Sequence, residues 1–250
     1  MMKKIIYFIV ILFLLEGCKK TQNNGGVIFT FDDQSIEEWF SYKDVFKKYK
    51  IKATFFITRP QLLDSNLIRK LKILESDGHE IACHGYNHIS VFNYKDTSDL
   101  YINNEILPSI KTLHSMGFKV VSFAYPFGDS TPTMDSLLLK YFKYIRKATY
   151  NINNTTINNY DNIYANKNSY YIVNAMGIDY NDKISLKNFE TGIKRAISNN
   201  EILILYAHSI DTIKGDFIIQ SEYLEKLFAI CKKNKIKSLT MKDMDKFYSK

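Results

Sequence analysis

Val27-Ile-Phe-Thr-Phe-Asp-Asp33 is a short apolar segment that ends in two adjacent carboxylates. Two other segments have the same form, in which polar groups directly follow an apolar run. His84-Gly-Tyr-Asn-His88 contains two histidines four residues apart, and Glu201-Ile-Leu-Ile-Leu-Tyr-Ala-His208 ends in a third. A carboxylate and two imidazoles form a common ligand set for zinc and similar ions, and catalytic zinc keeps a fourth position open. The three segments therefore predict one metal site, although they lie far apart in the sequence.

Short apolar segments alternate with helical stretches over the rest of the chain. Strands are predicted at 27–31, 53–57, 80–83, 120–124, 144–148, 170–174, 202–206 and 237–239, and helices at 36–48, 61–77, 97–116, 133–141, 186–199, 222–234 and 241–248. This alternation indicates an α/β protein with a parallel sheet and crossover helices. Each candidate site residue follows a strand, which in a closed barrel places it on the rim at the C-terminal ends of the strands. Periodicity alone does not distinguish a closed barrel from an open sheet.

Several helix ends carry recognisable signals. Asp64 and Thr240 precede predicted helices and offer oxygen atoms for N-capping. Gly78 and Gly117 follow predicted helix ends, where a positive φ favours glycine.

Residues 1–17 have the form of an export signal, with Lys3 and Lys4 before an unbroken apolar run that is too short for an ordinary transmembrane helix. Leu15-Glu-Gly-Cys18 resembles a bacterial lipobox, in which the cysteine is lipidated and becomes the mature N-terminus; Glu16 is unusual in that motif. We therefore expect an exported cell-envelope lipoprotein anchored to a membrane at Cys18, with a tether at 18–26 and the domain at 27–250. An uncleaved membrane anchor and ordinary secretion are the alternatives.

The formal net charge is +8, and removal of residues 1–17 leaves +7. The lysines are scattered along the sequence, which predicts a solvated surface attracted to anionic cell-wall polymers. No arginine-rich or aromatic-basic motif is present, so nucleic acid is not an expected partner. Cys83 and Cys231 are expected in the core, with a disulfide between them left open. Neighbours along a strand point to opposite faces, so Cys83 is not expected to share a metal with His84.

Four segments together resemble the polysaccharide deacetylase (NodB-homology) domain of the carbohydrate esterases. They are Thr30-Phe-Asp-Asp33, His84-Gly-Tyr-Asn-His88, Phe123-Ala-Tyr-Pro-Phe-Gly128 and Leu205-Tyr-Ala-His208, and the resemblance covers about residues 25–247. It implies a distorted (β/α)7-type barrel in a single domain. It also implies a monomeric, metal-dependent enzyme that hydrolyses N-acetyl groups of an N-acetylglucosamine-type polysaccharide of the cell envelope or extracellular space. The alternatives are an O-acetyl carbohydrate esterase and a catalytically inactive, lipid-anchored polysaccharide-binding protein.

The resemblance implies a role for each site residue. Asp33, His84 and His88 would hold one divalent metal ion, with zinc expected first, and Asp32 would be the general base. His208 would be the general acid, since a histidine titrates near neutrality and can hold the proton that a leaving amine requires. From the residues alone, the two aspartates also fit a helix N-cap, and His208 also fits a core histidine.

The third segment departs from the family pattern. Ala124 stands where the family has an arginine that normally holds the base carboxylate, so the orientation and pKa of Asp32 are left open. Phe127 replaces a tyrosine, and by resemblance its backbone N–H would stabilise the oxyanion. Tyr125 and Pro126 lie beside it in the same substrate-binding segment.

The partner of His208 is not recognisable, because the family's aspartate with a nearby tryptophan is missing. Asp179, Asp182 and Asp211 are the unranked candidates. An apolar strand and a nearby metal ion would lower the pKa of His208, whereas a neighbouring carboxylate would raise it. Trp39, the single tryptophan, is expected to pack the first helix rather than form the floor of the cleft.

Residues 150–168 contain eight asparagines and predict a loop near the rim. A second interpretation makes this loop a wall of the substrate groove, with Tyr160 and Tyr164 stacking on sugar rings.

Overall fold

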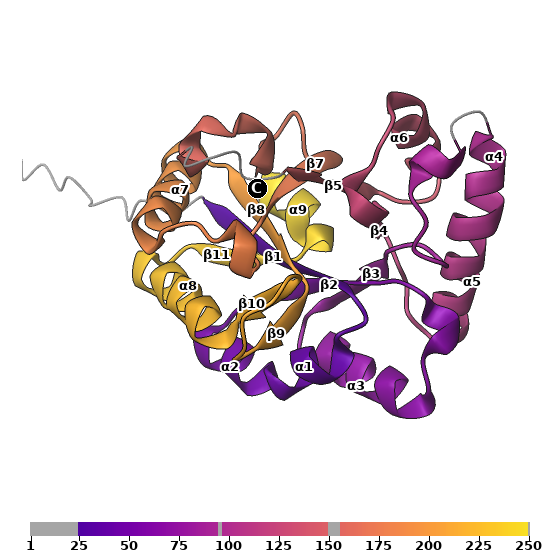
Figure 1. The fold of residues 1–250 in the computed structure, drawn as a ribbon. Helices are drawn as coiled ribbons and strands as arrows, with labels where there is room; N and C mark the ends of the chain where they lie inside the picture. Colours follow the sequence, from indigo (N-terminus) through magenta and orange to yellow (C-terminus); the bar gives the residue numbers. More distant parts are fainter. Residues whose placement is uncertain (1–24, 95–96, 150–155, 250) are drawn as a thin grey trace, which may run out of the picture.

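Seven parallel strands close into a barrel in the computed structural model, which describes residues 25–94, 97–149 and 156–249 (Figure 1). The barrel strands, in spatial order, are β1 (Gly26–Asp33), β2 (Ala53–Ile57), β3 (Glu80–Cys83), β4 (Ser122–Ala124), β5 (Tyr144–Thr149), β7 (Ile172–Gly177) and β8 (Ile202–Ala207). The last of them pairs with the first, which completes the circle. The single-domain (β/α)7 barrel implied by the resemblance is confirmed, and the open sheet that periodicity allowed is wrong.

Four short strands lie outside this ring. The strand expected at 237–239 is β11 (Lys237–Leu239), which pairs with the beginning of β1. The other three, of two or three residues each, were not predicted: β6 (Tyr164–Ala165), β9 (Ser209–Asp211) and β10 (Ile218–Gln220).

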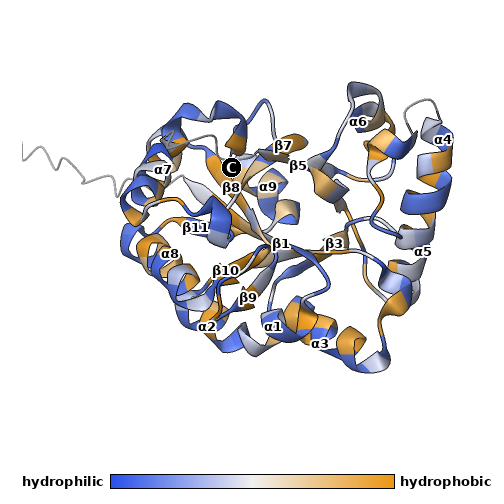
Figure 2. Cartoon of the chain, viewed as in Figure 1, coloured by the Kyte–Doolittle hydropathy of each residue, from blue (hydrophilic) through white to orange (hydrophobic). Residues whose placement is uncertain are grey.

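The barrel wall is apolar on both sides, which explains the continuous apolar runs in the sequence. Ile28 of β1 belongs to an apolar cluster inside the barrel, whereas Val27, Phe29 and Phe31 belong to the cluster between the wall and the helices. Figure 2 shows the central strands as largely apolar and the surrounding helices as mixed.

Two predicted helices are divided in the structure. The helix expected at 36–48 is α1 (Ile36–Ser41) followed by α2 (Lys43–Tyr49). The helix expected at 97–116 consists of α4 (Ser98–Tyr101), a π-helical turn, η3 (Ile102–Ile106), and α5 (Leu107–Ser115). Pro108 accounts for the second interruption, because proline has no N–H to donate to the preceding turn.

The remaining helices lie close to their predicted ranges: α3 (Ser65–Ser76), α6 (Pro132–Leu138), α7 (Leu186–Asn199), α8 (Ser221–Asn234) and α9 (Met244–Tyr248). Asp64 caps α3 as predicted, since its Oδ1 accepts the Leu67 N–H at 2.8 Å. Gly78 and Gly117 have the expected positive φ, at 95° and 83°. Within the described ranges, no helix has the length and apolar character that a bilayer-spanning segment needs.

The N-terminal end of the barrel is plugged. The turn η8 (Met241–Asp243) and α9 insert Met241 and Met244 into the apolar cluster inside the barrel. Buried Glu80 accepts hydrogen bonds from Thr54 Oγ1, Ser122 Oγ and the Lys242 N–H. The C-terminal ends of the strands therefore form the open mouth of the barrel.

Both described cysteines are buried and free, so the disulfide left open by the sequence does not form. Cys83 lies in the outer apolar cluster with its Sγ 3.2 Å from the Ser109 Oγ. The export signal at 1–17 and Cys18 lie outside the described residues.

Candidate functional site

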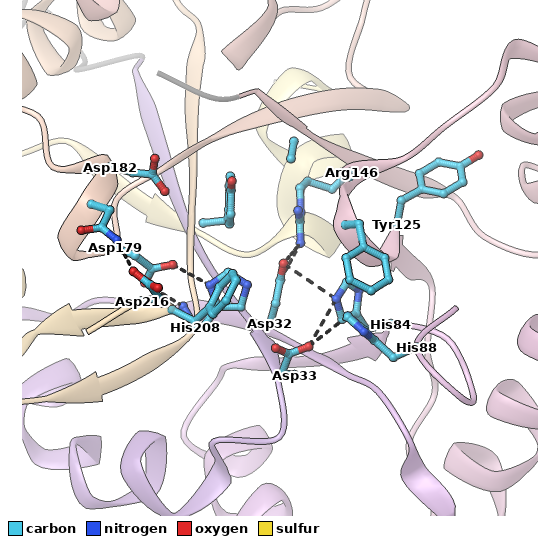
Figure 3. A pocket seen from close by; sticks show the side chains of 16 residues that line it. Asp32, Asp33, His84, His88, Tyr125, Arg146, Asp179, Asp182, His208 and Asp216 are labelled. Carbon is cyan, nitrogen blue, oxygen red and sulfur yellow. Dashed lines mark hydrogen bonds and ion pairs between the residues drawn. The ribbon is translucent and has the colours of Figure 1, made fainter. Parts of the chain in front are cut away.

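A cavity of about 430 Å³ lies at the C-terminal ends of the barrel strands. Asp32 and Asp33 enter it from the end of β1, His84 and His88 from the loop after β3, and His208 from the end of β8 (Figure 3). The chain turns sharply at Asp33, whose φ is 82°, so both adjacent carboxylates reach the cavity. The structure thus brings all five predicted metal and proton-transfer residues together.

Asp33, His84 and His88 present three ligand atoms to one point. The Asp33 Oδ1 lies 3.7 Å from the His84 Nε2 and 3.2 Å from the His88 Nε2. Tetrahedral ligands at zinc bond lengths of about 2.0–2.2 Å stand about 3.4 Å apart, so both distances suit a shared ion. The Asp33 Oδ1 is also buried without a hydrogen-bond partner, which is unfavourable unless a cation satisfies it. These residues therefore fit one divalent metal ion.

The buried ring of His84 is held in a ligand-ready tautomer. Its Nδ1 lies 2.8 Å from the carbonyl oxygen of Ala124, and because a carbonyl only accepts, Nδ1 carries the proton. The Nε2 lone pair is therefore free to face Asp33. Burial lowers the pKa of His84 to about 4, which keeps the ring neutral, as metal binding requires.

The loop that carries both histidines is fixed by Glu105, a fully buried residue of the π-helical turn. The Glu105 carboxylate accepts the backbone N–H of Asn87 at 2.9 Å and the Asn87 side-chain amide at 2.8 Å. Gly85 and His88 both have positive φ, 84° and 60°, and a left-handed histidine persists only where its surroundings hold it. Sequence analysis missed Glu105, because the helical pattern gives no sign that this acid is buried.

Asp32 lies deeper in the barrel and pairs with Arg146 of β5. The Arg146 Nη2 contacts both carboxylate oxygens of Asp32, and both side chains are almost completely buried. Burial acts to raise the pKa of Asp32, but Arg146, His84 and His208 together hold it below its ordinary value. Asp32 is therefore ionised at neutral pH, as a general base must be.

Arg146 lies one strand away from the position of the family's arginine. Ala124 of β4 and Arg146 of β5 are partners in register, so the two positions have the same height in the barrel. The guanidinium lies 5.2 Å from the ring centres of both Phe56 and Tyr206. Sequence analysis missed Arg146, and its signal was a charge inside the predicted strand Tyr144-Ile-Arg-Lys-Ala148.

His208 is oriented by Asp179, which follows β7. The His208 Nδ1 lies 2.5 Å from the Asp179 Oδ2, and the His208 backbone N–H donates to the Asp179 Oδ1 at 3.1 Å. Burial acts to lower the pKa of His208, but the hydrogen bond to Asp179 and the charges of Asp32, Asp179 and Asp33 raise it above its ordinary value. The sequence left open whether carboxylates or the apolar strand would determine the pKa of His208. The carboxylates raise this pKa by more than burial lowers it.

The other residues considered around His208 have different roles. Asp182 lines the cavity, and burial with the nearby Asp179 raises its pKa. The Asp211 carboxylate accepts the Thr212 N–H instead. Trp39 is fully buried, as expected, and its Nε1 also donates to the His208 carbonyl at 2.7 Å, which fixes the end of β8.

Two phenylalanines border the cavity, one beside each group of site residues. The Phe127 ring lies 4.6 Å from the His88 ring, and the Phe217 ring lies 4.9 Å from the His208 ring. The two side chains are 55% and 66% exposed, and both residues have left-handed φ, at 60° and 58°. Exposed aromatic rings in a strained backbone conformation are typical of binding sites.

The neighbours of Phe127 play a supporting part in the geometry. Tyr125 contributes its ring to the cavity wall, but its hydroxyl points away and donates to the Asp135 Oδ1 at 2.9 Å (Figure 3). Pro126 is buried at the start of the turn η4 (Pro126–Gly128) that presents Phe127. The oxyanion role of the Phe127 N–H stays a prediction.

The interpretation of residues 150–168 as a sugar-stacking wall is wrong for Tyr164. Its ring is buried, with the Arg195 guanidinium 3.9 Å from the ring centre. Tyr160 packs against the outer apolar cluster. Both rings pack against the outer apolar cluster, and neither lines the cavity.

Comparisons with known proteins show the family to which this chain is similar. The family model described as polysaccharide deacetylase matches residues 19–145, just over half of the chain. The "Bifunctional xylanase/deacetylase" of Pseudobutyrivibrio xylanivorans is 33% identical over 88 residues, which are 32% of this chain and 14% of that protein. The "Putative polysaccharide deacetylase YheN" of Bacillus subtilis is 29% identical over 124 residues, which are 48% of this chain and 42% of that protein. This chain therefore spans less than half of the length of either relative.

Solved structures show the same fold at low sequence identity. The chitin deacetylase of Colletotrichum lindemuthianum superposes with a TM-score of 0.57 at 18% identity, covering 88% of this chain and 86% of that one. The match of the family model over just over half of the chain, which includes Asp32, Asp33, His84 and His88, establishes that this chain belongs to the polysaccharide deacetylase family.

Proposed function

We propose that this protein removes N-acetyl groups from an N-acetylglucosamine-type polysaccharide of the cell envelope or extracellular space, using one divalent metal ion. The observation that carries the proposal is the arrangement in Figure 3, where the Asp33–His84–His88 cluster faces both an ionised Asp32 and His208. Metal ligands, base and acid then surround one cavity, as amide hydrolysis requires.

The first half of the reaction uses the Asp32 side of the cavity. An ion held by Asp33, His84 and His88 would polarise the acetyl carbonyl and lower the pKa of a water molecule from about 15.7 toward 7. Asp32, kept ionised by Arg146, accepts a proton as the water oxygen attacks the carbonyl carbon.

The Phe127 N–H, on the His88 side of the cavity, donates a hydrogen bond to the oxyanion that forms in this attack. The second half of the reaction uses the opposite side, where His208 lies. As the carbon–nitrogen bond breaks, protonated His208 donates its proton to the leaving nitrogen, while Asp179 holds the ring in place. The products are acetate and a free amine on the sugar.

Phe127 and Phe217 fit the apolar face of a pyranose ring. Aromatic rings supply apolar area with little loss of side-chain freedom, and both of these rings are exposed at the cavity. We assign them to the sugar on either side of the acetyl group that reacts.

An O-acetyl carbohydrate esterase is the second candidate, favoured by the similarity to a xylanase/deacetylase. The His208–Asp179 pair supports the amide substrate, because an amine leaves poorly without a proton. The third candidate is an inactive polysaccharide-binding protein, which was suggested because Ala124 stands where the family has an arginine. Arg146 removes that argument, since it supplies the same charge to Asp32.

We further propose that the protein is exported and held to a membrane through a lipid on Cys18, and that it acts as a monomer. The basic, apolar and lipobox-like segments before residue 19 support this location.

The deciding experiment measures acetate release from chitooligosaccharides, peptidoglycan, poly-N-acetylglucosamine and O-acetylated xylan. We expect release from an N-acetylated glycan, its loss with a chelator and its recovery with added zinc. Acetate only from xylan would select the esterase, and acetate from no glycan with any divalent ion would select the binding protein. Elemental analysis should find about one metal per chain, with much less in His84→Ala and His88→Ala.

A further inference from the structure

Lysines that are scattered in the sequence gather at the plugged end of the barrel. One hollow of about 260 Å³ is lined by Lys47, Lys50 and Lys52, and an adjoining hollow of about 160 Å³ by Lys52, Lys237 and Lys246. Lys242 extends beside the first hollow, where its Nζ donates to the His79 carbonyl at 3.3 Å. These six residues are called the lysine face below. Lysines that are scattered along the sequence are therefore close together in the structure at this end of the molecule.

The charge of the lysine face is not neutralised locally. Within the part of the chain that the structure describes, none of these six lysines has a carboxylate within 4.0 Å. The lysines that form ion pairs are all outside the lysine face. Two acids line the same hollows, Asp77 and Asp243, and the second is engaged in the capping box of Thr240. Six positive charges thus face two negative ones, which favours an anionic partner.

The described chain begins on this same face. The Lys237 N–H donates to the Gly25 carbonyl at 3.3 Å, and Gly26 is paired in register with Lys237. Cys18 precedes Gly25 by seven residues, which span at most about 25 Å when fully extended. A lipid on Cys18 would therefore hold the lysine face close to the headgroups of the membrane.

We propose that the lysine face binds the anionic headgroups of the membrane in which Cys18 is anchored. The inference rests on the proposed lipid anchor and adds an orientation to it. The catalytic cavity lies at the opposite end of the barrel, so its mouth points away from the membrane, toward polysaccharide. Each lysine near an anionic surface strengthens such binding roughly fivefold, and the effect is limited to about the Debye length of 8–10 Å.

The test uses the full-length lipidated protein in vesicles of phosphatidylcholine alone or of phosphatidylcholine mixed with phosphatidylglycerol, an anionic lipid. A water-soluble amine reagent labels the lysines, and mass spectrometry reads the rate at each one. We expect Lys50, Lys52 and Lys246 to react at least about fivefold more slowly in the anionic vesicles. Lys187 and Lys214, exposed residues away from the plugged end, serve as controls and should not change. Equal rates at Lys50, Lys52 and Lys246 in the two vesicles overturn the proposal.

Two triple variants with the same net charge distinguish binding by the lysine face from attraction of the whole protein to the anionic membrane. Lys50→Gln, Lys52→Gln and Lys246→Gln together should abolish the slow labelling of Lys237 and Lys242, whereas Lys111→Gln, Lys187→Gln and Lys214→Gln together should leave it. Loss of the slow labelling in both triple variants would mean that only net charge matters, against the proposal.

Two further measurements identify the partner and the anchor. Soluble polyphosphate added to phosphatidylcholine vesicles should protect the six lysines less than phosphatidylglycerol does. Equal protection would assign the face to a phosphate polymer and overturn the membrane assignment. The mass of the N-terminal peptide reports on the lipid by itself. A lipid-free Cys18, with the six lysines still protected by phosphatidylglycerol, would reject the anchor and uphold the lysine face.

Discussion

At the residue scale, Asp32, the proposed base, is paired with an arginine from a different strand than the family pattern predicts. Asp32 needs a cation to stay ionised when buried, and any inward position at its height can supply one. Ala124 and Arg146 occupy such positions on neighbouring strands and are partners in register. The charge is thus preserved, although the segment that should carry it lacks arginine.

The first prediction tests Arg146 as the residue that positions and ionises Asp32. In Arg146→Ala, the burial that raises the pKa of Asp32 is no longer opposed by its closest cation. The base must be deprotonated, so the acid limb of the kcat profile should move to higher pH. Activity at pH 7 should fall toward the loss of about 10²–10⁴ that removal of a general base causes.

Arg146→Lys is the conservative control, and it should restore part of the rate because it keeps a positive charge. Asp32→Asn should lose the rate at every pH while it keeps its metal. An unshifted acid limb in Arg146→Ala, in a variant that unfolds at the wild-type temperature, would show that Arg146 does not set the pKa of Asp32.

The second prediction concerns the acid. His208 donates only when protonated, so kcat should fall as pH rises through its pKa, which Asp179 holds above the ordinary value. Asp179→Asn removes the carboxylate charge that, with Asp32 and Asp33, opposes the effect of burial, so the pKa of His208 should fall. The alkaline limb should therefore move to lower pH, with a loss of at least about tenfold at pH 8.

Asp182→Asn is the matched control, since Asp182 lines the same cavity but is not bonded to the ring. An aryl acetate supplies a second control, because its leaving group needs no proton and its alkaline limb should stay in place. An identical shift on both substrates would mean that His208 binds or orients substrate and that another group is the acid.

Some of these site residues could be predicted from the sequence, and others could not. The place of the Asp33–His84–His88 cluster was predictable because its segments lie at the ends of apolar strands, which meet at one rim, and the resemblance supplied the role of each residue. The partners Arg146, Asp179 and Glu105 were missed or unranked because each reaches its target across the fold, at a separation of 18 residues or more. No local pattern encodes such pairing.

At the element scale, the π-helical turn η3 has a consequence for the metal site. It directs the buried Glu105 carboxylate at the loop between His84 and His88, the two proposed histidine ligands. π-Helical turns occur often at functional sites, since the extra residue redirects a side chain. The predicted helix at 97–116 was correct in extent but not in this interruption, because Pro108 changes the backbone geometry without changing the apolar periodicity.

The third prediction tests this element. In Glu105→Gln, the amide keeps one accepting oxygen and places N–H donors opposite the donors of Asn87, so the histidine loop loses its support. Zinc affinity should fall about 10–100-fold, as expected for a group that orients metal ligands. A chelator competition titration measures it, and Asp99→Asn, an exposed acid of the adjoining α4, should bind zinc normally. A less stable variant with unchanged zinc affinity would limit Glu105 to a structural role.

At the scale of the whole molecule, the barrel has two ends with different chemistry. The mouth carries the carboxylates, histidines and exposed aromatic rings, whereas the plugged end carries the lysine face and the start of the described chain. The barrel followed from the alternation of elements together with the resemblance, but this polarity did not. The lysines involved come from α2, the loop before β2, β11 and the C-terminal turns, and only the closed barrel brings them together.

The fourth prediction separates the two ways in which this end of the protein can be held to a membrane. A lipid on Cys18 binds through buried methylene groups and is insensitive to salt, whereas lysine attraction is screened at 0.5 M salt, where the Debye length falls to about 4 Å. Wild-type protein should therefore stay with the membrane fraction after a 0.5 M salt wash. Cys18→Ser, processed by ordinary cleavage, should be released by that wash but retained at low salt.

The measurement is an immunoblot of washed membranes together with the mass of the mature N-terminus. Wild-type protein that is washed off by salt, or that begins at a residue other than Cys18, would reject the lipid anchor while leaving export intact. Uncleaved Cys18→Ser would remain after the wash through its apolar 5–15 segment, and its larger mass identifies that case.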